Sequence, residues 1–194
     1  VYRHTPAYKV TSGWHGDRVD ADGKYVPNAK GDALQCIEEA ISRLKDYRSL
    51  DDSTVLVSIK YLVHLVGDMH CPVHVKYPWY KNFKFDLNGR PSEFHSFWDS
   101  GVLDLTHRWG YVEYRHQLDR LTKKEIRAVT AGTPRDWLEE SARDCRVIYE
   151  WTKPGQKFTK TEARDLLNTV HPFAEEQILK AGYRLAAVLN QLFG

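Results

Sequence analysis

The chain has 194 residues, which is enough for one domain with its own core. Hydrophobic residues make up 42% and charged residues 28%, a composition that excludes a disordered chain. The net charge of +2 permits an anionic ligand but is far from that of a strongly basic nucleic-acid-binding domain. No apolar run approaches the roughly 20 residues that cross a bilayer, so no transmembrane segment is expected. Three cysteines are too few for a disulfide scaffold, and the sequence leaves open whether two of them pair.

Helical signals follow a loop-rich beginning. Residues 1–30 are rich in Gly, Asp, Tyr and Pro and are predicted to form loops. Apolar spacing predicts a helix over residues 33–47, which Asp32 can cap. The next predicted helix, over residues 54–70, is apolar on nearly all sides, so we expect it to be buried in the middle of the fold. Pro72 ends this helix.

The second half of the chain also favours helices. Residues 75–93 look irregular, with a hairpin expected around Asn88 and Gly89. Further helices are predicted over residues 94–100, 122–129, 134–151, 160–169 and 172–192. Because strand signals are few, the sequence predicts a single mainly helical (all-α) domain over residues 1–194, with a buried central helix and long functional loops.

Two His–Asp pairs carry the chemistry. His64 and Asp68 are one helical turn apart in the most apolar helix, and His95 and Asp99 repeat this spacing in a second helix. Either pair alone is more often an ion pair or a satisfied histidine than a metal site. However, burying an imidazole and a carboxylate is costly without a strong partner. Two pairs, with His74 nearby, make a metal ion the simplest partner, and their donor atoms suit Zn²⁺.

The motifs around these residues resemble a known family. The runs HLVGDMHCPVH (residues 64–74) and FHSFWDSGVL (residues 94–103) resemble the zinc-dependent single-strand nucleases of the fungal S1/P1 type and the plant bifunctional nucleases. Bacterial zinc phospholipase C is a more distant relative of these enzymes. The run SGWHGD (residues 12–17) resembles the family segment that supplies a further histidine, and AGYRLAAVLNQLF (residues 181–193) resembles the family's C-terminal helix.

The resemblance implies a cluster of three zinc ions. One zinc would be held by His15, His64 and Asp68, with Asp68 as the catalytic carboxylate that bridges to a second zinc. The third zinc would be held by His74, His95 and Asp99. Three further residues of the family site have no counterpart in this sequence: the N-terminal Trp, a nearby His, and an Asp expected just before Val1 that shares the first zinc. We therefore expect that the chain lacks the family's N-terminal segment, and that fewer than three zinc ions can bind to it.

The resemblance also implies an activity. The implied enzyme is a zinc-dependent endonuclease that cleaves single-stranded DNA or RNA. It would also have 3′-nucleotidase activity and would give 5′-phosphate products. Such a protein would be secreted or periplasmic and would need no stable protein partner. Two alternatives remain open, a phosphoesterase of the phospholipase C type and a non-catalytic relative with an incomplete metal site. Tyr80 and Asn82 partly match a family Gly-Gly-Asn and are the candidate substrate-binding residues.

Other residues near the motifs have simpler interpretations. His70 lies two residues after Asp68 on a different helix face, so we expect it to be structural or to support a ligand. His107, His116 and His171 have no partner at a helpful spacing and are expected at the surface or at helix ends. Cys71 is not expected to bind zinc, because Pro72 and the neighbouring ligands already fix the geometry. Trp98 is expected to pack in the core beside the metal site.

Overall fold

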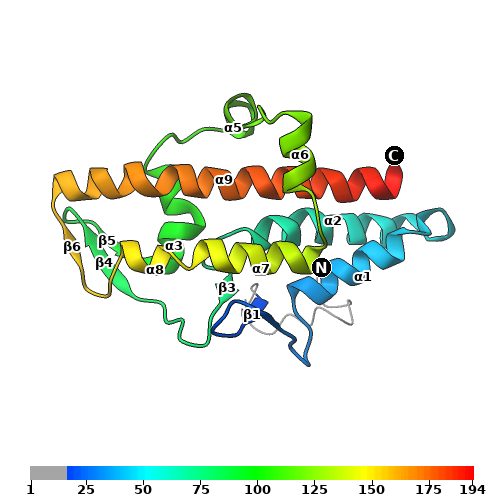
Figure 1. Cartoon of the computed structure of the whole chain (residues 1–194), viewed down its shortest axis with the longest axis horizontal. Coiled ribbons are helices and arrows are strands. Elements are labelled where there is room, and N and C mark those ends of the chain that lie inside the picture. The colour runs from blue at the N-terminus through cyan, green and yellow to red at the C-terminus, as the bar shows by residue number, and fades with distance from the viewer. Residues whose placement is uncertain (1–16) are drawn as a thin grey trace.

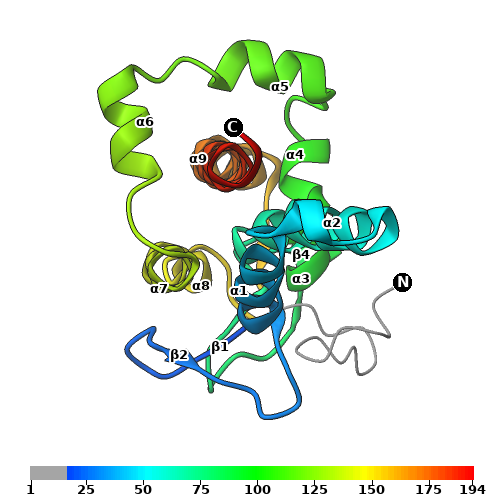
Figure 2. The same cartoon turned by 90° about the vertical axis from the view of Figure 1, so that its right-hand side faces the viewer.

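One long helix organises the molecule. The computed structural model describes residues 17–194, and its helix α9 (Lys160–Phe193) runs along the long axis of the molecule (Figure 1). Viewed along α9, the other helices lie around it (Figure 2). The mainly helical class predicted from the sequence is therefore confirmed. Among the described residues, no helix is long and apolar enough to cross a membrane.

The first two helices begin where their capping residues predict. The N-cap of α1 (Ala33–Leu44) is Asp32, whose Oδ1 accepts a hydrogen bond of 2.9 Å from the backbone N–H of Gln35. The N-cap of α2 (Asp52–Met69) is Asp51, which accepts one of 3.0 Å from Thr54. The two helices pack against each other, and both contact α9. A 3₁₀ turn, η2 (Tyr47–Ser49), lies between them.

Helix α2 is buried on one side only. Leu62, Leu65 and Val66 are fully buried on the side that packs in the core, whereas Leu56 and Val63 are 52% and 50% exposed. The expectation that this helix is buried on nearly all sides is therefore wrong. A continuous apolar run shows that a helix can be buried, but it does not show how many neighbours cover it.

Two small sheets connect distant parts of the chain. In the first, β1 (Asp17–Val19) lies between β2 (Tyr25–Val26) and β3 (Val75–Lys76), with Asp17 opposite Val75 in a parallel pair. In the second, β4 (Lys84–Leu87) lies between β5 (Pro91–Glu93) and β6 (Lys157–Phe158). Asn88 and Gly89 join β4 to β5 with φ angles of 54° and 80°, which confirms the predicted hairpin.

The middle of the chain forms short helices. They are α3 (Phe94–Ser96), the π-helical turn η3 (Phe97–Gly101), α4 (Val102–Asp104), α5 (Tyr111–Leu118), α6 (Lys123–Val129), α7 (Pro134–Cys145) and α8 (Ile148–Trp151). The helix predicted over residues 134–151 is divided into α7 and α8, and α5 was not predicted. Helix α5 has no buried residue, so it lacks the apolar stripe by which a helix is recognised in a sequence.

Helix α9 continues through a proline. Two helices were predicted, over residues 160–169 and 172–192, because proline removes a hydrogen bond and clashes with the preceding turn. The structure has a single helix with Pro172 inside it. Val170 and Ala174, on either side of the proline, are buried in the core. Tertiary packing therefore favours the continuous helix despite the local cost.

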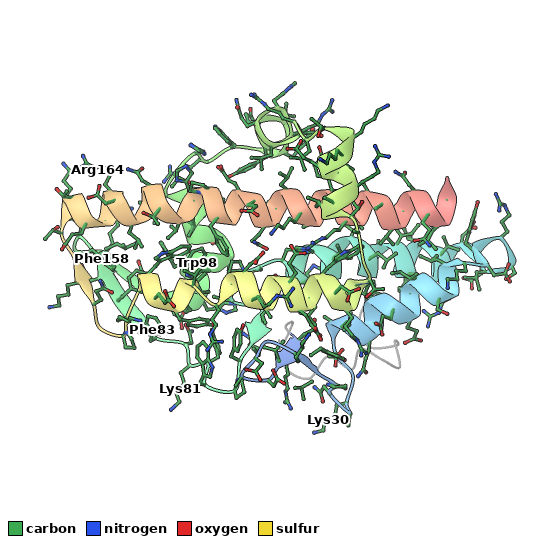
Figure 3. The ribbon with its side chains drawn as sticks, in the orientation of Figure 1. Lys30, Lys81, Phe83, Trp98, Phe158 and Arg164 are labelled. Atoms are coloured by element: carbon green, nitrogen blue, oxygen red, sulfur yellow. The ribbon has the colours of Figure 1, made fainter. Side chains whose placement is uncertain are left out.

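The core consists of two apolar clusters. One lies mainly among α1, α2 and α7, and the other is formed by the second sheet, the segment from α3 to α4 and the first half of α9. Tyr80 and Tyr149 pack against both clusters. Trp98, labelled in Figure 3, belongs to the second cluster. It stacks on Trp151 and meets Phe173 edge-on. Its expected packing role is thereby confirmed.

Candidate metal centre

Three of the predicted ligands meet at the end of α2. Asp68 lies in the last turn of α2, His74 follows a tight turn, and Asp99 belongs to the π-helical turn η3. Asp68 Oδ1 is 3.1 Å from His74 Nδ1, and Asp99 Oδ1 is 3.5 Å from His74 Nε2. The imidazole of His74 therefore lies between two carboxylates. π-Helical turns are rare and occur frequently at functional sites.

The two outer histidines lie beside this triad. His64 Nε2 is 4.0 Å from Asp68 Oδ2, and the side chain of His64 is 42% exposed. The His95 ring stacks on the His74 ring, with 5.3 Å between centroids and 30° between planes. The structure thus brings together five of the six residues that the sequence assigned to metal binding. The sixth, His15, lies outside the described residues.

One buried oxygen at the centre has unmet bonding capacity. Asp68 Oδ2 has no hydrogen-bond partner among the described residues, whereas the buried His74 Nδ1 lies 3.1 Å from Asp68 Oδ1. An unsatisfied buried polar group costs about 1–3 kcal/mol. A cation beside Asp68 would offset this cost, and carboxylate and imidazole are donors that zinc prefers. The residues present therefore fit a zinc ion.

The charges at the centre also suit metal binding. Burial alone lowers the pKa of His74, but its contacts with Asp68 and Cys71 raise this pKa to about 10. Without a metal, His74 therefore carries a proton that a cation can replace. Burial, followed by the charges of Lys76 and His74, lowers the pKa of His95. Both effects favour the neutral form of His95, which is the form of imidazole that binds a metal.

Cys71, which was not expected to bind zinc, lies close to His74 and Asp99. Its Sγ is 3.8 Å from Asp99 Oδ1, and ligand atoms of Cys71, His74 and Asp99 all lie within 4.8 Å of one another. The backbone N–H of His74 donates to the carbonyl of Cys71, so a tight turn brings the two residues together. In the sequence, Cys71 precedes His74 by three residues and Pro72 lies between them. This pattern is typical of a turn and was the signal for the contact between the two residues.

The two candidate substrate-binding residues have contacts within the protein. Asn82 Oδ1 accepts hydrogen bonds from the backbone N–H groups of His95 (3.0 Å) and Phe83 (3.1 Å), while its Nδ2 donates to Glu93. Asn82 therefore holds the segment that presents His95. Tyr80 is half-buried, and Lys76 Nζ lies 4.5 Å from the centre of its ring. Their role in substrate binding stays a prediction.

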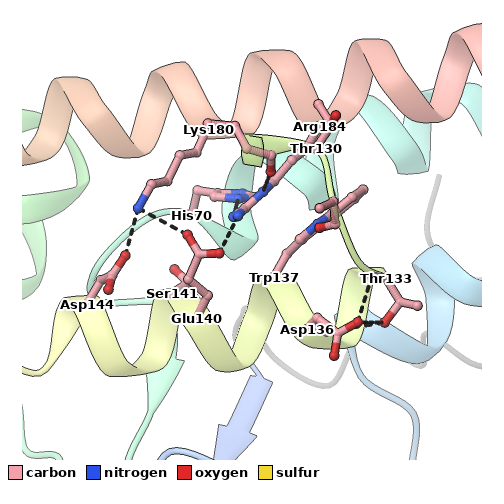
Figure 4. Close-up of polar contacts among 12 residues, drawn as sticks. His70, Thr130, Thr133, Asp136, Trp137, Glu140, Ser141, Asp144, Lys180 and Arg184 are labelled. Carbon is pink, nitrogen blue, oxygen red and sulfur yellow. Dashed lines mark hydrogen bonds and ion pairs between the residues drawn. The ribbon is translucent and has the colours of Figure 1, made fainter. Parts of the chain in front are cut away.

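His70 points away from the centre and into the core. Its Nε2 is 2.9 Å from a guanidinium nitrogen of Arg184, and its Nδ1 is 2.7 Å from the carbonyl oxygen of Val66 (Figure 4). Since arginine can only donate, His70 is neutral and carries its proton on Nδ1. Burial lowers the pKa of His70 to about 4, which agrees with this tautomer. Of the two roles expected for His70, the structural one is confirmed.

Comparison with known proteins places these motifs in context. A family model described as S1/P1 Nuclease matches residues 1–194. Endonuclease 2 of Arabidopsis thaliana is 23% identical over 185 residues, which cover 84% of this chain and 64% of that protein. Endonuclease 1 of the same plant is 24% identical over 161 residues, covering 70% of this chain and 49% of that protein. The chain thus spans about half to two thirds of the length of these relatives.

Proposed function

Because the chain belongs to the S1/P1 nuclease family, we propose that it is a zinc-dependent hydrolase of phosphodiester bonds in single-stranded DNA or RNA. Its products would carry 5′-phosphates, and 3′-nucleotides would be further substrates. The observation that carries this proposal is the convergence of Asp68, His74 and Asp99, with the buried Asp68 Oδ2 left without a hydrogen-bond partner among the described residues. The similarity to plant proteins named as endonucleases supports the same reaction class.

Each residue of the centre has a role in the proposal. His64, Asp68, His74, His95 and Asp99 would hold zinc, together with His15. Zinc supplies positive charge that stabilises phosphoryl oxygens and makes bound water more acidic. Asp68 and Asp99 orient the ring of His74 from both sides, and Asn82 fixes the segment of His95. Lys76, whose charge lowers the pKa of His95, adds a positive charge that favours a phosphate.

The decisive experiment compares two substitutions in one helix. Asp68→Asn should reduce cleavage of a single-stranded oligonucleotide by about 100-fold or more, because a neutral amide binds cations poorly. Asp52→Asn, an exposed residue in the first turn of α2, should leave the rate close to that of the unchanged protein. The assay uses full-length protein loaded with zinc. Full activity of Asp68→Asn would refute the assignment.

The same assay separates the alternatives. A 3′-mononucleotide and phosphatidylcholine are tested beside the oligonucleotide. Turnover of the lipid alone would establish the phospholipase C type of activity instead. No turnover of any substrate by the intact zinc-loaded protein would favour a non-catalytic relative. Metal analysis of His95→Ala should show a lower zinc content than that of the unchanged protein.

The family resemblance also motivates a location. We propose that the protein is secreted or periplasmic and acts without a stable protein partner. Cell fractionation tests the first point and size-exclusion chromatography the second. Recovery of the native protein from the cytoplasm alone would contradict the proposed location.

A further inference from the structure

A second cluster of metal-binding side chains lies outside the centre around Asp68. His107 follows α4, and His171 and Glu175 lie one turn apart on α9. His107 Nδ1 is 2.8 Å from Glu175 Oε1. One ligand atom from each of the three residues lies within 4.8 Å of the other two. His107 is exposed, as expected, but the expectation that these histidines have no partner is wrong, because His107 pairs with Glu175 and lies beside His171.

His171 is held in the tautomer that binds metals. Its Nδ1 is 2.9 Å from the backbone carbonyl oxygen of Leu167, one turn earlier in α9. A carbonyl can only accept, so Nδ1 carries the proton and Nε2 presents a lone pair. Histidines that bind metals almost always donate their other N–H to such a carbonyl or to a carboxylate. Its orientation is thus the one expected of a ligand.

His107 and Glu175 are also held in place. The His107 ring stacks on Trp109 with 3.8 Å between centroids, and it meets the His171 ring edge-on at 5.0 Å. The side chain of Glu175 is only 12% exposed, so its negative charge requires a cationic partner. A simple ion pair would account for His107 and Glu175. It would not account for the position of His171, whose ring faces His107 instead of a carboxylate of its own.

We propose that His107, His171 and Glu175 form a binding site for a divalent cation, with zinc as the preferred ion. Two imidazoles and one carboxylate are a known zinc donor set, and water can fill the fourth position. His107 and His171 line a cavity of about 580 Å³. This site does not depend on the centre at the end of α2, with which it shares no residue.

The site has a structural consequence for the neighbouring centre. An ion here would fasten the segment after α4 to α9. Arg108 and Trp109, next in that segment, line another cavity of about 560 Å³ together with Asp99. The ion would therefore hold one wall of the space beside the candidate metal centre, where a substrate strand could lie.

Metal content provides the test, because it does not depend on any catalytic activity. The full-length protein is equilibrated with Zn²⁺, freed of unbound ion and analysed for zinc per chain. His171→Ala should bind one zinc fewer than the unchanged protein, whereas His116→Ala, an exposed histidine in α5, should bind the same amount. His95→Ala, which alters the other centre, should retain the zinc bound here.

His171→Ala distinguishes a metal site from an ion pair, because it leaves the His107–Glu175 pair intact. Unchanged zinc content in a folded His171→Ala protein would overturn the proposal. Circular dichroism establishes folding. If His171→Ala does not fold, His107→Ala replaces it, since the His107 side chain is 34% exposed and lies outside both apolar clusters. Retention of all zinc by that variant would equally overturn the proposal.

Discussion

Arg184 shows at the scale of a residue how this fold accommodates a buried charge. Its side chain is only 2% exposed, yet its guanidinium donates to His70 Nε2, the carbonyl of Val129 and a carboxylate oxygen of Glu140 (Figure 4). Lys180, on the same helix, adds ion pairs to Glu140 and Asp144. These bonds join α9 to α7 and to the end of α2, and each nitrogen of the Arg184 guanidinium has a partner.

Removing this cation should be costly. Arg184→Met keeps most of the side-chain volume but leaves His70 Nε2 without its donor and Glu140 with Lys180 as its remaining cationic partner. We expect a loss of about 3–5 kcal/mol in the free energy of unfolding, measured by urea denaturation. Arg43→Met, which breaks only a partly exposed ion pair within α1, should cost less than about 1 kcal/mol. Similar losses for both variants would contradict this assignment.

The same network predicts an acid-sensitive contribution to stability. Burial raises the pKa of Glu140, but its bonds to Lys180 and Arg184 lower it more, so the net pKa lies below the ordinary value of 4.5. The unfolded chain then binds a proton at a higher pH than the folded one, and stability falls as the pH drops below this value. Glu140→Gln should weaken that decline between roughly pH 5 and 3, as measured by urea denaturation at each pH. An unchanged pH dependence in this variant would show that the carboxylate does not contribute.

At the scale of elements, α9 is the clearest case of packing that overrides a local signal. Thr159 begins the helix with a capping box, in which its hydroxyl and the Glu162 carboxylate satisfy the first backbone N–H groups. Pro172 then interrupts the hydrogen bonding, but the helix continues because buried residues flank it on both sides. The hydrogen bond lost and the steric clash at Pro172 are therefore offset by the tertiary contacts of α9.

Replacing this proline should stabilise the protein. Pro172→Ala restores a backbone hydrogen bond and removes a steric clash, so we expect a gain of about 1–3 kcal/mol in the free energy of unfolding. Gly182→Ala provides a control in the same helix, where a methyl group would meet no atom within 4 Å. Its gain should be smaller, about 0.5–1 kcal/mol. Denaturant unfolding measures both, and destabilisation by Pro172→Ala would show that the proline is needed for packing.

At the scale of the whole molecule, the two apolar clusters are coupled through aromatic side chains. Tyr149 packs against both, meeting Trp79 edge-on at 4.7 Å and lying 5.1 Å from the Phe94 ring, measured between centroids. Its hydroxyl is buried without a hydrogen-bond partner among the described residues. The ring therefore contributes through packing, and the hydroxyl does not.

Two substitutions of Tyr149 separate these contributions. Tyr149→Ala should lower the free energy of unfolding by about 3–5 kcal/mol, because it opens a cavity where the two clusters meet. Tyr149→Phe keeps the ring and should change stability by less than about 1 kcal/mol. Urea unfolding followed by circular dichroism measures both. A phenylalanine variant as unstable as the alanine variant would mean that the hydroxyl has a partner.

The sequence by itself determined what depends on residues close together in the chain. Asp32 and Asp51 cap α1 and α2 as their positions predict, because a cap needs only the next three residues. Asn88 and Gly89 determine the hairpin for the same reason. The four-residue spacing of His64 and Asp68 placed both on one helical face. The spacing indicated the two His–Asp pairs of the candidate centre, and the family resemblance implied that they would converge with His74.

Tertiary structure decided the features that depend on distant partners. It set which side of α2 is covered and carried α9 through Pro172, since both depend on the helices packed alongside. It also turned the Cys71 thiol towards Asp99, 28 residues later in the chain. His107 meets Glu175 across a separation of 68 residues, so the four-residue spacing of His171 and Glu175 alone could not reveal that cluster. Hydrogen bonds and helix periodicity act over a few residues, whereas packing brings together side chains that the sequence keeps far apart.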